Sequence, residues 1–420
     1  MNPASAPTAP AAQRPPMLTL DEALERLLTA VPARSPADAE TVSTFDALGR
    51  VLAEDIRSGF DVPPQDNSEM DGYALRSADV PAAGALLPVR QRIPAGVVGT
   101  PLQPGTAARI FTGAQVPAGA DAVVMQELCS AEGEGVRVAT VPTPGQAIRR
   151  RGEDVRKGAV VLAAGLRLRP QGLGMAASVG AATLRVARRP RVALFSTGDE
   201  LAMPGEPLKP GAIYNSNRFT LRALIESLGG VVEDLGIVAD TLEATREALR
   251  RAAEGNDLIV TCGGVSVGEE DHLKPAVQAE GRLDLWQIAI KPGKPLAFGE
   301  VRRADASSAH FIGLPGNPVS AFVTFALAVR PFLLRLQGAT DLQPRPIAMR
   351  ADFDWPRPDR RREFMRVRRN DAGGLDLFAN QSSGVLTSTV WGDGVVDNPA
   401  SQPIRTGDTV RYIPFVELLG

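Results

Sequence analysis

The pattern of hydrophobic and polar positions divides the 420-residue chain into regions of different texture. Apolar residues recur at helical spacing over residues 18–29, which predicts an amphipathic helix. Residues 58–157 hold short apolar pieces between glycines and prolines, as is typical of a β-rich domain. Residues 191–338 alternate short apolar runs with helical periods, which predicts a parallel sheet with helices on both faces. Residues 339–420 are β-like again and predict a small C-terminal β domain.

Helix boundaries are marked by local signals. Thr19 is the predicted cap of the first helix, with Glu22 three residues later. The run SNRFTLRALIESLGG predicts a second helix, capped by Ser216 or Asn217 and ended by Gly229. The buried face of this second helix is predicted to consist of Leu221, Leu224, Ile225 and Leu228.

The stretch DLIVTCGGVSVGEEDHLKPAV, residues 257–277, is the strongest local candidate for a ligand site. A short apolar strand turns through Gly263 and Gly264, which let a backbone approach a ligand closely, and the amides at the following helix start favour an anion such as phosphate. The carboxylates that follow, up to Asp271, indicate a metal ion or a reaction that needs a carboxylate. A plain strand-to-helix turn with an acidic first turn is the structural alternative.

Further loops carry similar chemistry, although each has a structural alternative. STGDEL ends at Leu201, after another predicted strand, and ligands bind such sheets beyond the carboxyl ends of their strands. IKPGKP follows the predicted strand LWQIAI and holds Lys291 and Lys294 in a stiff frame suited to an oxyanion. GLPGNPVSAF predicts a helix capped by Asn317 with Pro318 at its first position. DNSEMDGYAL could be an Asx turn and RRRGEDVRKG a solvated hairpin, but five such loops in one chain exceed what packing requires.

Composition limits the remaining possibilities. A net charge of −2, from 46 basic and 48 acidic residues, gives no general attraction to nucleic acid or to an anionic membrane. No apolar run approaches the roughly 20 residues of a membrane helix, and residues 1–17 read as a flexible Pro/Ala tail without signal-peptide features, so we expect a cytoplasmic protein. Cys129 and Cys262 fit a reducing compartment, and with only His272 and His310 no zinc cluster is predicted. Cys262 is predicted to be a packing residue.

These motifs, in their order along the chain, closely resemble the molybdopterin molybdenumtransferase family, the MoeA and gephyrin E-domain proteins, over residues 18–420. The resemblance implies an elongated homodimer of four-domain subunits, with Mg2+ assisting the insertion of molybdate into adenylylated molybdopterin and the release of AMP. It implies a discontinuous linking domain, a β-rich domain, a central α/β molybdopterin-binding domain and a C-terminal β-barrel. Their expected bounds are 18–57 with 158–190, 58–157, 191–338 and 339–420.

The resemblance also implies site residues, position by position. The expected catalytic residues are Asp71, Asp154, Glu200, Asp240 and Asp271, of which the last three are expected Mg2+ ligands. The expected substrate-binding residues are Thr112, Arg149, Gly263, Gly264, Ser266, Lys291, Lys294, Pro315, Pro318, Arg361, Arg366, Ser382 and Ser383. The chain departs from the family pattern at Gln287 and Arg360, which affects how charge is shared around the oxyanion pocket.

In the expected reaction, charge develops on phosphate oxygens while molybdate joins two sulfurs, so cations and an oriented water or oxo group are needed. The lysines, an arginine of the last domain and Ser383 would bind molybdate, and the glycine loop would hold phosphates of the substrate. A gephyrin-like scaffold and a molybdopterin adenylyltransferase are the alternatives, with an adenylyltransferase partner and acceptor molybdoenzymes as further expected contacts. AMP release would exclude a scaffold, and ATP consumption would indicate the adenylyltransferase.

Overall fold

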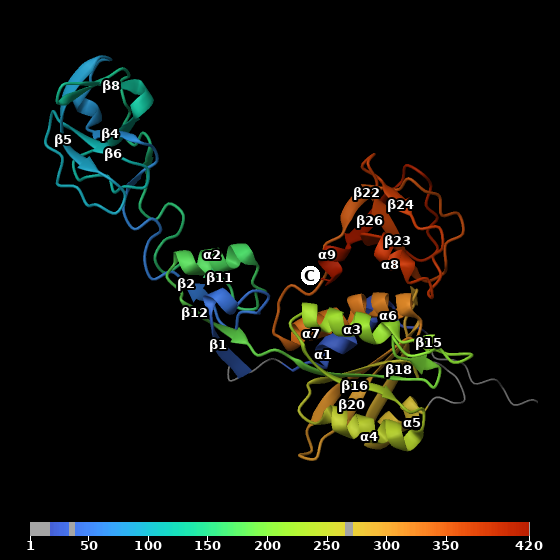
Figure 1. Cartoon of the computed structure of the whole chain (residues 1–420). Helices are drawn as coiled ribbons and strands as arrows, with labels where there is room; N and C mark the ends of the chain where they lie inside the picture. Colours follow the sequence, from blue (N-terminus) through green and yellow to red (C-terminus); the bar gives the residue numbers. More distant parts are fainter. Residues whose placement is uncertain (1–16, 33–37, 265–271, 420) are drawn as a thin grey trace, which may run out of the picture. The chain divides into compact units, whose positions relative to one another are not determined.

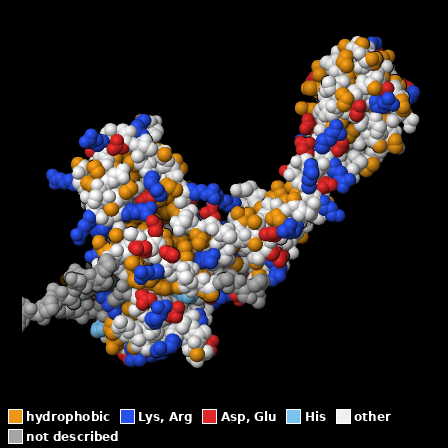
Figure 2. Space-filling model, turned by 180° about the vertical axis from the view of Figure 1, so that it is seen from behind, with side chains coloured by type: hydrophobic (Ala, Val, Ile, Leu, Met, Phe, Trp, Pro, Cys, Tyr) orange, Lys and Arg blue, Asp and Glu red, His pale blue; other side chains and the backbone are white. Residues whose placement is uncertain are grey.

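The computed structural model describes residues 17–32, 38–264 and 272–419. The chain divides into two compact units, which are described separately. The large unit comprises Met1–Glu40, Gly49–Ala53 and Ala187–Gly420, and the small unit comprises Thr41–Leu48 and Glu54–Val186. On the face shown in Figure 2, basic and acidic side chains are interspersed on the surface, in keeping with the nearly balanced net charge.

The large unit is built on a six-stranded sheet with the order β16-β13-β17-β21-β20-β18. The strands are β16 (Val231–Val238), β13 (Arg191–Thr197), β17 (Leu258–Cys262), β21 (Ser308–Leu314), β20 (Pro295–Arg302) and β18 (Gly281–Gln287). The first four pair in parallel, as predicted, but β20 pairs antiparallel with both of its neighbours, β21 and β18. The short connection between β20 and β21 explains the difference, because a parallel pair needs a crossover of a dozen or more residues.

Helices cover both faces of this sheet, which confirms the predicted α/β architecture (Figure 1). Side chains that alternate along β13 enter different cores: Leu194 packs on one face, and Ala193 and Phe195 pack on the other. The Leu194 core contains residues of α1 (Leu20–Thr29), α3 (Ser216–Ser227), α6 (Pro318–Thr324) and α7 (Arg330–Leu336), whereas the second core contains residues of α4 (Leu242–Ala253) and α5 (Leu273–Glu280).

The helix starts follow the predicted signals with one correction. Thr19 and Glu22 form a capping box at α1. At α3 the cap is Asn215, whose side chain accepts a hydrogen bond from the Arg218 amide at 3.1 Å, so the prediction of Ser216 or Asn217 was wrong. Asn217 is instead used in a tertiary contact, described below.

The helical run Pro318–Leu336, which continues from α6 through a π-helical segment into α7, is long and apolar enough to cross a membrane by length and composition alone. Our expectation that no apolar run approaches this length was therefore wrong. In the structure 89% of its apolar window is buried inside the protein, as in a core helix. Its residues, among them Phe325 and Phe332, pack in the core beneath the sheet.

A second sheet of the large unit has the order β19-β23-β25-β26-β22, with β24 paired to β23. Its strands are β19 (Ile290–Lys291), β23 (Arg362–Arg369), β25 (Gly394–Asn398), β26 (Thr409–Pro414), β22 (Ile347–Arg350) and β24 (Leu375–Leu377), and α8 (Thr387–Trp391) and α9 (Phe415–Leu419) accompany them. The predicted strand LWQIAI is split, because β18 ends at Gln287 and the chain then joins this second sheet as β19. A bridge between Ala351 and Leu375 connects the region after β22 with β24.

The small unit is β-rich, as predicted, around a six-stranded sheet with the order β7-β4-β6-β5-β9-β8. These strands are β7 (Ala122–Met125), β4 (Gly72–Leu75), β6 (Ala107–Ile110), β5 (Ala85–Ile93), β9 (Gly135–Val138) and β8 (Cys129–Glu132). The short pairs are β2 (Ile56–Arg57) with β11 (Val160–Leu162), β3 (Asn67–Ser68) with β10 (Ile148–Arg149), and β1 (Ala39–Ser43) with β12 (Thr183–Ala187); α2 (Pro170–Ser178) is the helix. The minor pair β14 (Leu201–Ala202) and β15 (Ile213–Tyr214) belongs to the large unit.

Candidate functional site

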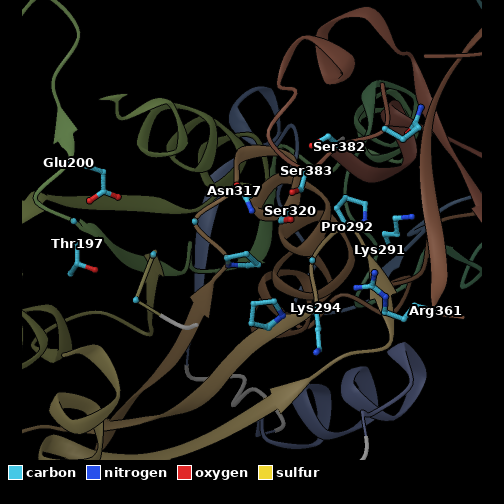
Figure 3. A pocket seen from close by; sticks show the side chains of 18 of the residues that line it. Thr197, Glu200, Lys291, Pro292, Lys294, Asn317, Ser320, Arg361, Ser382 and Ser383 are labelled. Atoms are coloured by element: carbon cyan, nitrogen blue, oxygen red, sulfur yellow. The ribbon is translucent and has the colours of Figure 1, made fainter. Parts of the chain in front are cut away.

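A pocket of about 680 Å³ lies in the large unit, where loops from the ends of the parallel strands meet loops of the second sheet (Figure 3). Its lining brings together many residues expected from the sequence: Glu200, Asp240, Gly263, Gly264, Lys291, Lys294, Pro315, Arg361, Ser382 and Ser383. Figure 3 places Thr197 and Glu200 on one side of the pocket and Lys291, Lys294 and Arg361 on the other. The pocket is thus divided into a carboxylate side and a cationic side.

The glycine turn after β17 allows three loops to approach one another at the pocket. A Cβ on Gly263 would lie 2.9 Å from the Thr197 carbonyl oxygen, and Gly263 has a φ of 99°. The Gly263 amide donates to the Leu314 carbonyl at 3.1 Å. Any larger residue at position 263 would therefore push the turn away from β13.

Cys262 and Asn217 support the adjoining proline loop, residues 315–318, through hydrogen bonds to its carbonyl groups. The side-chain amide of Asn217 donates to Cys262 Sγ at 3.0 Å and to the Gly316 carbonyl at 2.7 Å. The Cys262 thiol in turn donates to the Pro315 carbonyl oxygen, with a distance of 3.2 Å from Sγ to the oxygen. Burial raises the pKa of the Cys262 thiol to about 12, so at neutral pH it is a protonated hydrogen-bonding group and no nucleophile. This agrees with the predicted packing role.

The two lysines of IKPGKP differ in their surroundings. Lys291 Nζ donates to Glu363 Oε1 at 3.2 Å and lies 3.5 Å from Asp359 Oδ2. Lys294 makes no ion pair with any residue that the structure describes. Of the two lysines, Lys294 is therefore the one whose ammonium group is not paired with a described carboxylate and can bind an anionic ligand. The loop between them is tightly packed, since a Cβ on Gly293 would lie 2.3 Å from Thr324 Oγ1.

Arg361 is held by a carboxylate two residues earlier in the chain. Its Nε donates to Asp359 Oδ1 at 3.0 Å and its Nη2 donates to Asp359 Oδ2 at 2.9 Å. This pairing with the guanidinium keeps the pKa of Asp359 far below its usual range. The neighbouring Glu363 is only 2% exposed and accepts hydrogen bonds from Trp355 Nε1 at 2.8 Å and from the Asp359 amide at 3.0 Å.

The serine loop of the pocket rests on Arg366. This guanidinium is buried, and it donates to the Ser382 carbonyl at 3.2 Å and to Ser388 Oγ at 3.0 Å. Gln381 brackets the Arg366 backbone, accepting from its amide and donating to its carbonyl, both at 2.9 Å. Burial lowers the pKa of Arg366 to about 10. Arg366 thus lies beneath the lining and supports the loop that carries Ser383.

Glu200 and Asp240 both line the pocket and follow neighbouring strands, because β13 ends at Thr197, which pairs with Val238 at the end of β16. Glu200 folds back over Gly198, because a Cβ on that glycine would lie 2.5 Å from its carboxylate oxygen. Asp271 and Ser266, also expected here, lie outside the described residues. Among the residues that are described, no group of three or more His, Cys, Asp or Glu side chains forms a metal cluster. Two carboxylates still suit Mg2+, which takes one or two and keeps water and phosphate ligands.

The expected residues of the small unit form a separate set. Asp71 Oδ1 accepts hydrogen bonds from the Thr112 amide and hydroxyl, both at 2.8 Å, so the structure brings these two together. The amide contact, followed by the hydroxyl contact, lowers the pKa of Asp71. Arg149 lies on β10 opposite Asn67, and the Asp154 amide donates to the Val62 carbonyl at 3.0 Å.

Several lining residues were not predicted as site residues: Thr197, Gly198, Pro292, Gly293, Pro295, Gly316, Asn317, Ser320 and Gln381. Most of them lie inside the motifs STGDEL, IKPGKP and GLPGNP, so the motifs already marked their positions. Ser320 also lies inside a motif, GLPGNPVSAF, whereas Gln381 carries no such signal. Pro318 begins α6 and is outside the lining, as are the two departures from the family pattern, Gln287 and Arg360.

The fold and the pocket define an α/β protein with attached β-rich regions and a pocket suited to a small molecule that bears phosphate or another oxyanion. Cations, glycine turns and serine hydroxyls at the carboxyl edge of a parallel sheet are the groups such a ligand requires.

Comparisons with known proteins identify the family. Family models match the MoeA N-terminal region (domain I and II) at residues 18–180, a probable molybdopterin binding domain at 193–335, and the MoeA C-terminal region (domain IV) at 348–415. The chain is 39% identical to a molybdopterin molybdenumtransferase of Haemophilus influenzae, over 96% of this chain and all of that protein. It is 38% identical to molybdopterin molybdenumtransferase 2 of Mycobacterium tuberculosis, over 86% of this chain and 90% of that protein.

A crystal structure of a molybdopterin biosynthesis MoeA protein from Pyrococcus horikoshii OT3 is 31% identical, with a TM-score of 0.81 over 95% of this chain and 100% of that one. The chain therefore belongs to the MoeA family of molybdopterin molybdenumtransferases.

Proposed function

We propose that this chain is a molybdopterin molybdenumtransferase that inserts molybdate into adenylylated molybdopterin and releases AMP in molybdenum cofactor biosynthesis. The observation that carries the proposal is the division of one pocket into a cationic side and a carboxylate side. A reaction that joins an oxyanion to a phosphoanhydride substrate needs both. The full-length identity to transferases of this name supports the assignment.

The cationic side is where molybdate binds. Lys294 offers an ammonium group without a carboxylate partner among the described residues, and Arg361 and the serine hydroxyls surround the same space. Charge-assisted hydrogen bonds from such groups hold a tetrahedral dianion and orient its oxygens. The glycine amides at positions 263 and 264 serve the phosphates of the substrate.

The carboxylate side serves the cleavage of the phosphoanhydride. Glu200 and Asp240 would hold Mg2+ together with substrate phosphates, and Mg2+ would supply the positive charge that offsets the charge developing on phosphate oxygens. The family motif adds Asp271 to these expected Mg2+ ligands. The absence of a side chain at Gly198 leaves the space that the Glu200 carboxylate occupies.

In a homodimer whose active sites are formed by residues of both chains, the small unit would contribute Asp71 to the reaction. Asp71 is partly exposed to solvent at a bend in the chain, and its carboxylate is already oriented by Thr112, so it is prepared to meet a ligand brought to it. In a two-fold dimer the small unit of one protomer would meet the pocket of its partner. The substrate would then be bound by both chains.

The test of the activity is incubation of the purified protein with adenylylated molybdopterin, molybdate and Mg2+, following AMP release and transfer of the finished cofactor to an apoenzyme. We expect AMP release that depends on molybdate and consumes no ATP. ATP consumption without molybdate dependence would indicate an adenylyltransferase instead, and a protein with neither activity would indicate a scaffold.

Subunit mixing tests the composite site. Asp71→Ala and Asp271→Ala homodimers should both be inactive, because every site then lacks one carboxylate. A heterodimer of the two variants has one doubly damaged site and one intact site, so it should recover up to about half of the wild-type activity if the sites act independently. Verified heterodimers that remain as inactive as their parents would place both residues in the site of one chain.

A further inference from the structure

We propose that Asp359 is an internal anion that occupies Arg361 and Lys291 in the free pocket, competes with the incoming oxyanion, and thereby limits its affinity. The proposal rests on the proposed function for the identity of the oxyanion. Asp359 is itself outside the pocket lining.

The geometry of Asp359 is that of a bound oxyanion. Its two carboxylate oxygens receive the Nε and Nη2 hydrogens of Arg361 side by side, at 3.0 and 2.9 Å. Oxygen Oδ2 also lies 3.5 Å from Lys291 Nζ. This is the forked arrangement with which arginine binds a carboxylate, phosphate or other planar or tetrahedral anion. Both Arg361 and Lys291 line the pocket, so while Asp359 is bound to them these two cations are less able to bind a ligand in the cavity.

The local charges cancel in the free protein. Lys291 and Arg361 contribute two positive charges, and Asp359 and the buried Glu363 contribute two negative charges within the same contact network. Among the described residues of the lining, Lys294 remains the lysine or arginine without a carboxylate partner. A dianion needs more positive charge than one lysine supplies, so its binding favours a state in which Arg361 is released from Asp359.

Of the two carboxylates, Asp359 is the one able to move. Glu363 has 2% of its side chain exposed and accepts from the indole of Trp355 and from a backbone amide as well as from Lys291. The Asp359 side chain is 21% exposed, and among the residues that the structure describes it contacts only Arg361, through the guanidinium and the backbone amide, and Lys291. Water can therefore solvate Asp359 when it leaves the guanidinium, whereas moving Glu363 would leave a buried charge without partners.

If Asp359 served only to position Arg361, removal of its carboxylate would change the oxyanion affinity in the opposite direction. If the carboxylate only positions Arg361 for the ligand, its removal loosens the guanidinium and weakens oxyanion binding. If it competes with the ligand, its removal strengthens binding. The sign of one affinity change therefore separates the two roles.

The experiment is calorimetric titration of the full-length protein with sodium molybdate, without pterin substrate, for the wild type and for Asp359→Asn. We expect binding on the order of tenfold tighter in Asp359→Asn, the scale of coupling between two interacting sites. Asp284→Asn is the charge-matched control, since Asp284 also pairs with an arginine two residues away, on an exposed part of β18 outside the pocket. This control should leave the affinity unchanged.

Sulfate should gain affinity in Asp359→Asn as molybdate does, because the carboxylate competes with any tetrahedral dianion. On the wild type, molybdate should also shift the NMR resonance of the Arg361 Nε–H, an observation that does not depend on the stability of a variant. Unchanged or weaker molybdate binding in folded Asp359→Asn overturns the inference while the proposed function stands. A wild-type protein that binds no molybdate at all overturns the proposed function and the inference together.

Discussion

The pocket of the large unit and the Asp71 turn of the small unit both carry carboxylates in Gly-rich loops, yet they are built in opposite ways. The pocket gathers its side chains from loops far apart in sequence, from Thr197 to Ser383, and leaves a hollow between them. The turn satisfies its carboxylate locally, through two hydrogen bonds from Thr112 on the neighbouring strand connection. A hollow with unpaired cationic charge can bind a ligand by itself, whereas a single oriented carboxylate outside the pocket acts on a ligand held elsewhere.

The difference extends to how each region would fail. The turn depends on one sheet, in which β4 lies between the edge strand β7 and β6, so damage to that sheet removes the turn as a whole. The pocket depends on several loops with separate supports, such as Asn217 under the proline loop and Arg366 under the serine loop. Single substitutions should therefore change its parts one at a time.

The largest effect is expected from Gly72→Ala. A Cβ at this position would lie 2.0 Å from the Val124 carbonyl oxygen, so β4 and β7 must separate. We expect a loss of about 3 kcal/mol in the stability of the small unit, the upper range of overpacking, with no change in the molybdate affinity of the pocket. Calorimetric unfolding and molybdate titration measure the two quantities. Gly59→Ala is the control, since a Cβ there meets nothing within 4 Å, and a lower molybdate affinity in Gly72→Ala would show that the regions are coupled.

Within the pocket, Lys294→Ala should be more harmful to catalysis than Lys291→Ala. Loss of the unpaired ammonium group should lower kcat/KM by about 100-fold, the cost of removing one preorganised electrostatic donor, without changing Tm. Lys291→Ala should lower kcat/KM less than Lys294→Ala but reduce stability by about 1 kcal/mol, because Glu363 loses a partner while retaining Trp355. Steady-state kinetics and thermal unfolding give both values, and Lys209→Ala supplies an exposed control outside the lining. Equal losses of activity would contradict the difference between the lysines.

The smallest effect concerns the titration of Asp71. Its lowered pKa means that the contribution of its contacts to stability is present above the ordinary value of 3.8 and is lost as the pH falls through the folded-state value. Thr112→Ala removes the hydroxyl and keeps the amide, so the pKa of Asp71 should rise toward its ordinary value without reaching it. Carboxyl NMR titration measures the change, with Thr112→Ser as the variant that retains the hydroxyl. An unmoved pKa would mean that the amide alone orients Asp71.

The sequence was sufficient for much of the fold because its signals are local. The α1 capping box, the buried face of α3 and the succession of strands and helices all follow from residues within a few positions of one another. The antiparallel edge formed by β18 and β20 was missed, since direction depends on the length of connections between strands. The Asn215 cap was missed because three polar residues in succession could each have capped the helix.

For the site, sequence motifs predicted the loops better than the roles. Lys291 and Lys294 look equivalent in IKPGKP, and only the placement of Asp359 and Glu363 from a distant segment distinguishes them. Arg366 looks like a ligand-binding arginine in its motif, yet the structure buries it beneath the serine loop. Ser320 lies within the motif GLPGNPVSAF but was not predicted to line the site, and Gln381 gave no signal, because the contribution of each residue arises from tertiary packing.

Strand β19 connects the two sheets of the large unit. Ile290 and Lys291 pair with β23 of the second sheet, while the preceding and following strands of the chain, β18 and β20, belong to the first sheet. The loop that carries Lys294 is thus part of the seam between the two sheets, and Arg361 stands at the start of the strand on the other side of that seam. A ligand bound by Lys294 and Arg361 spans the seam, so ligand occupancy and cohesion of the two sheets are thermodynamically linked.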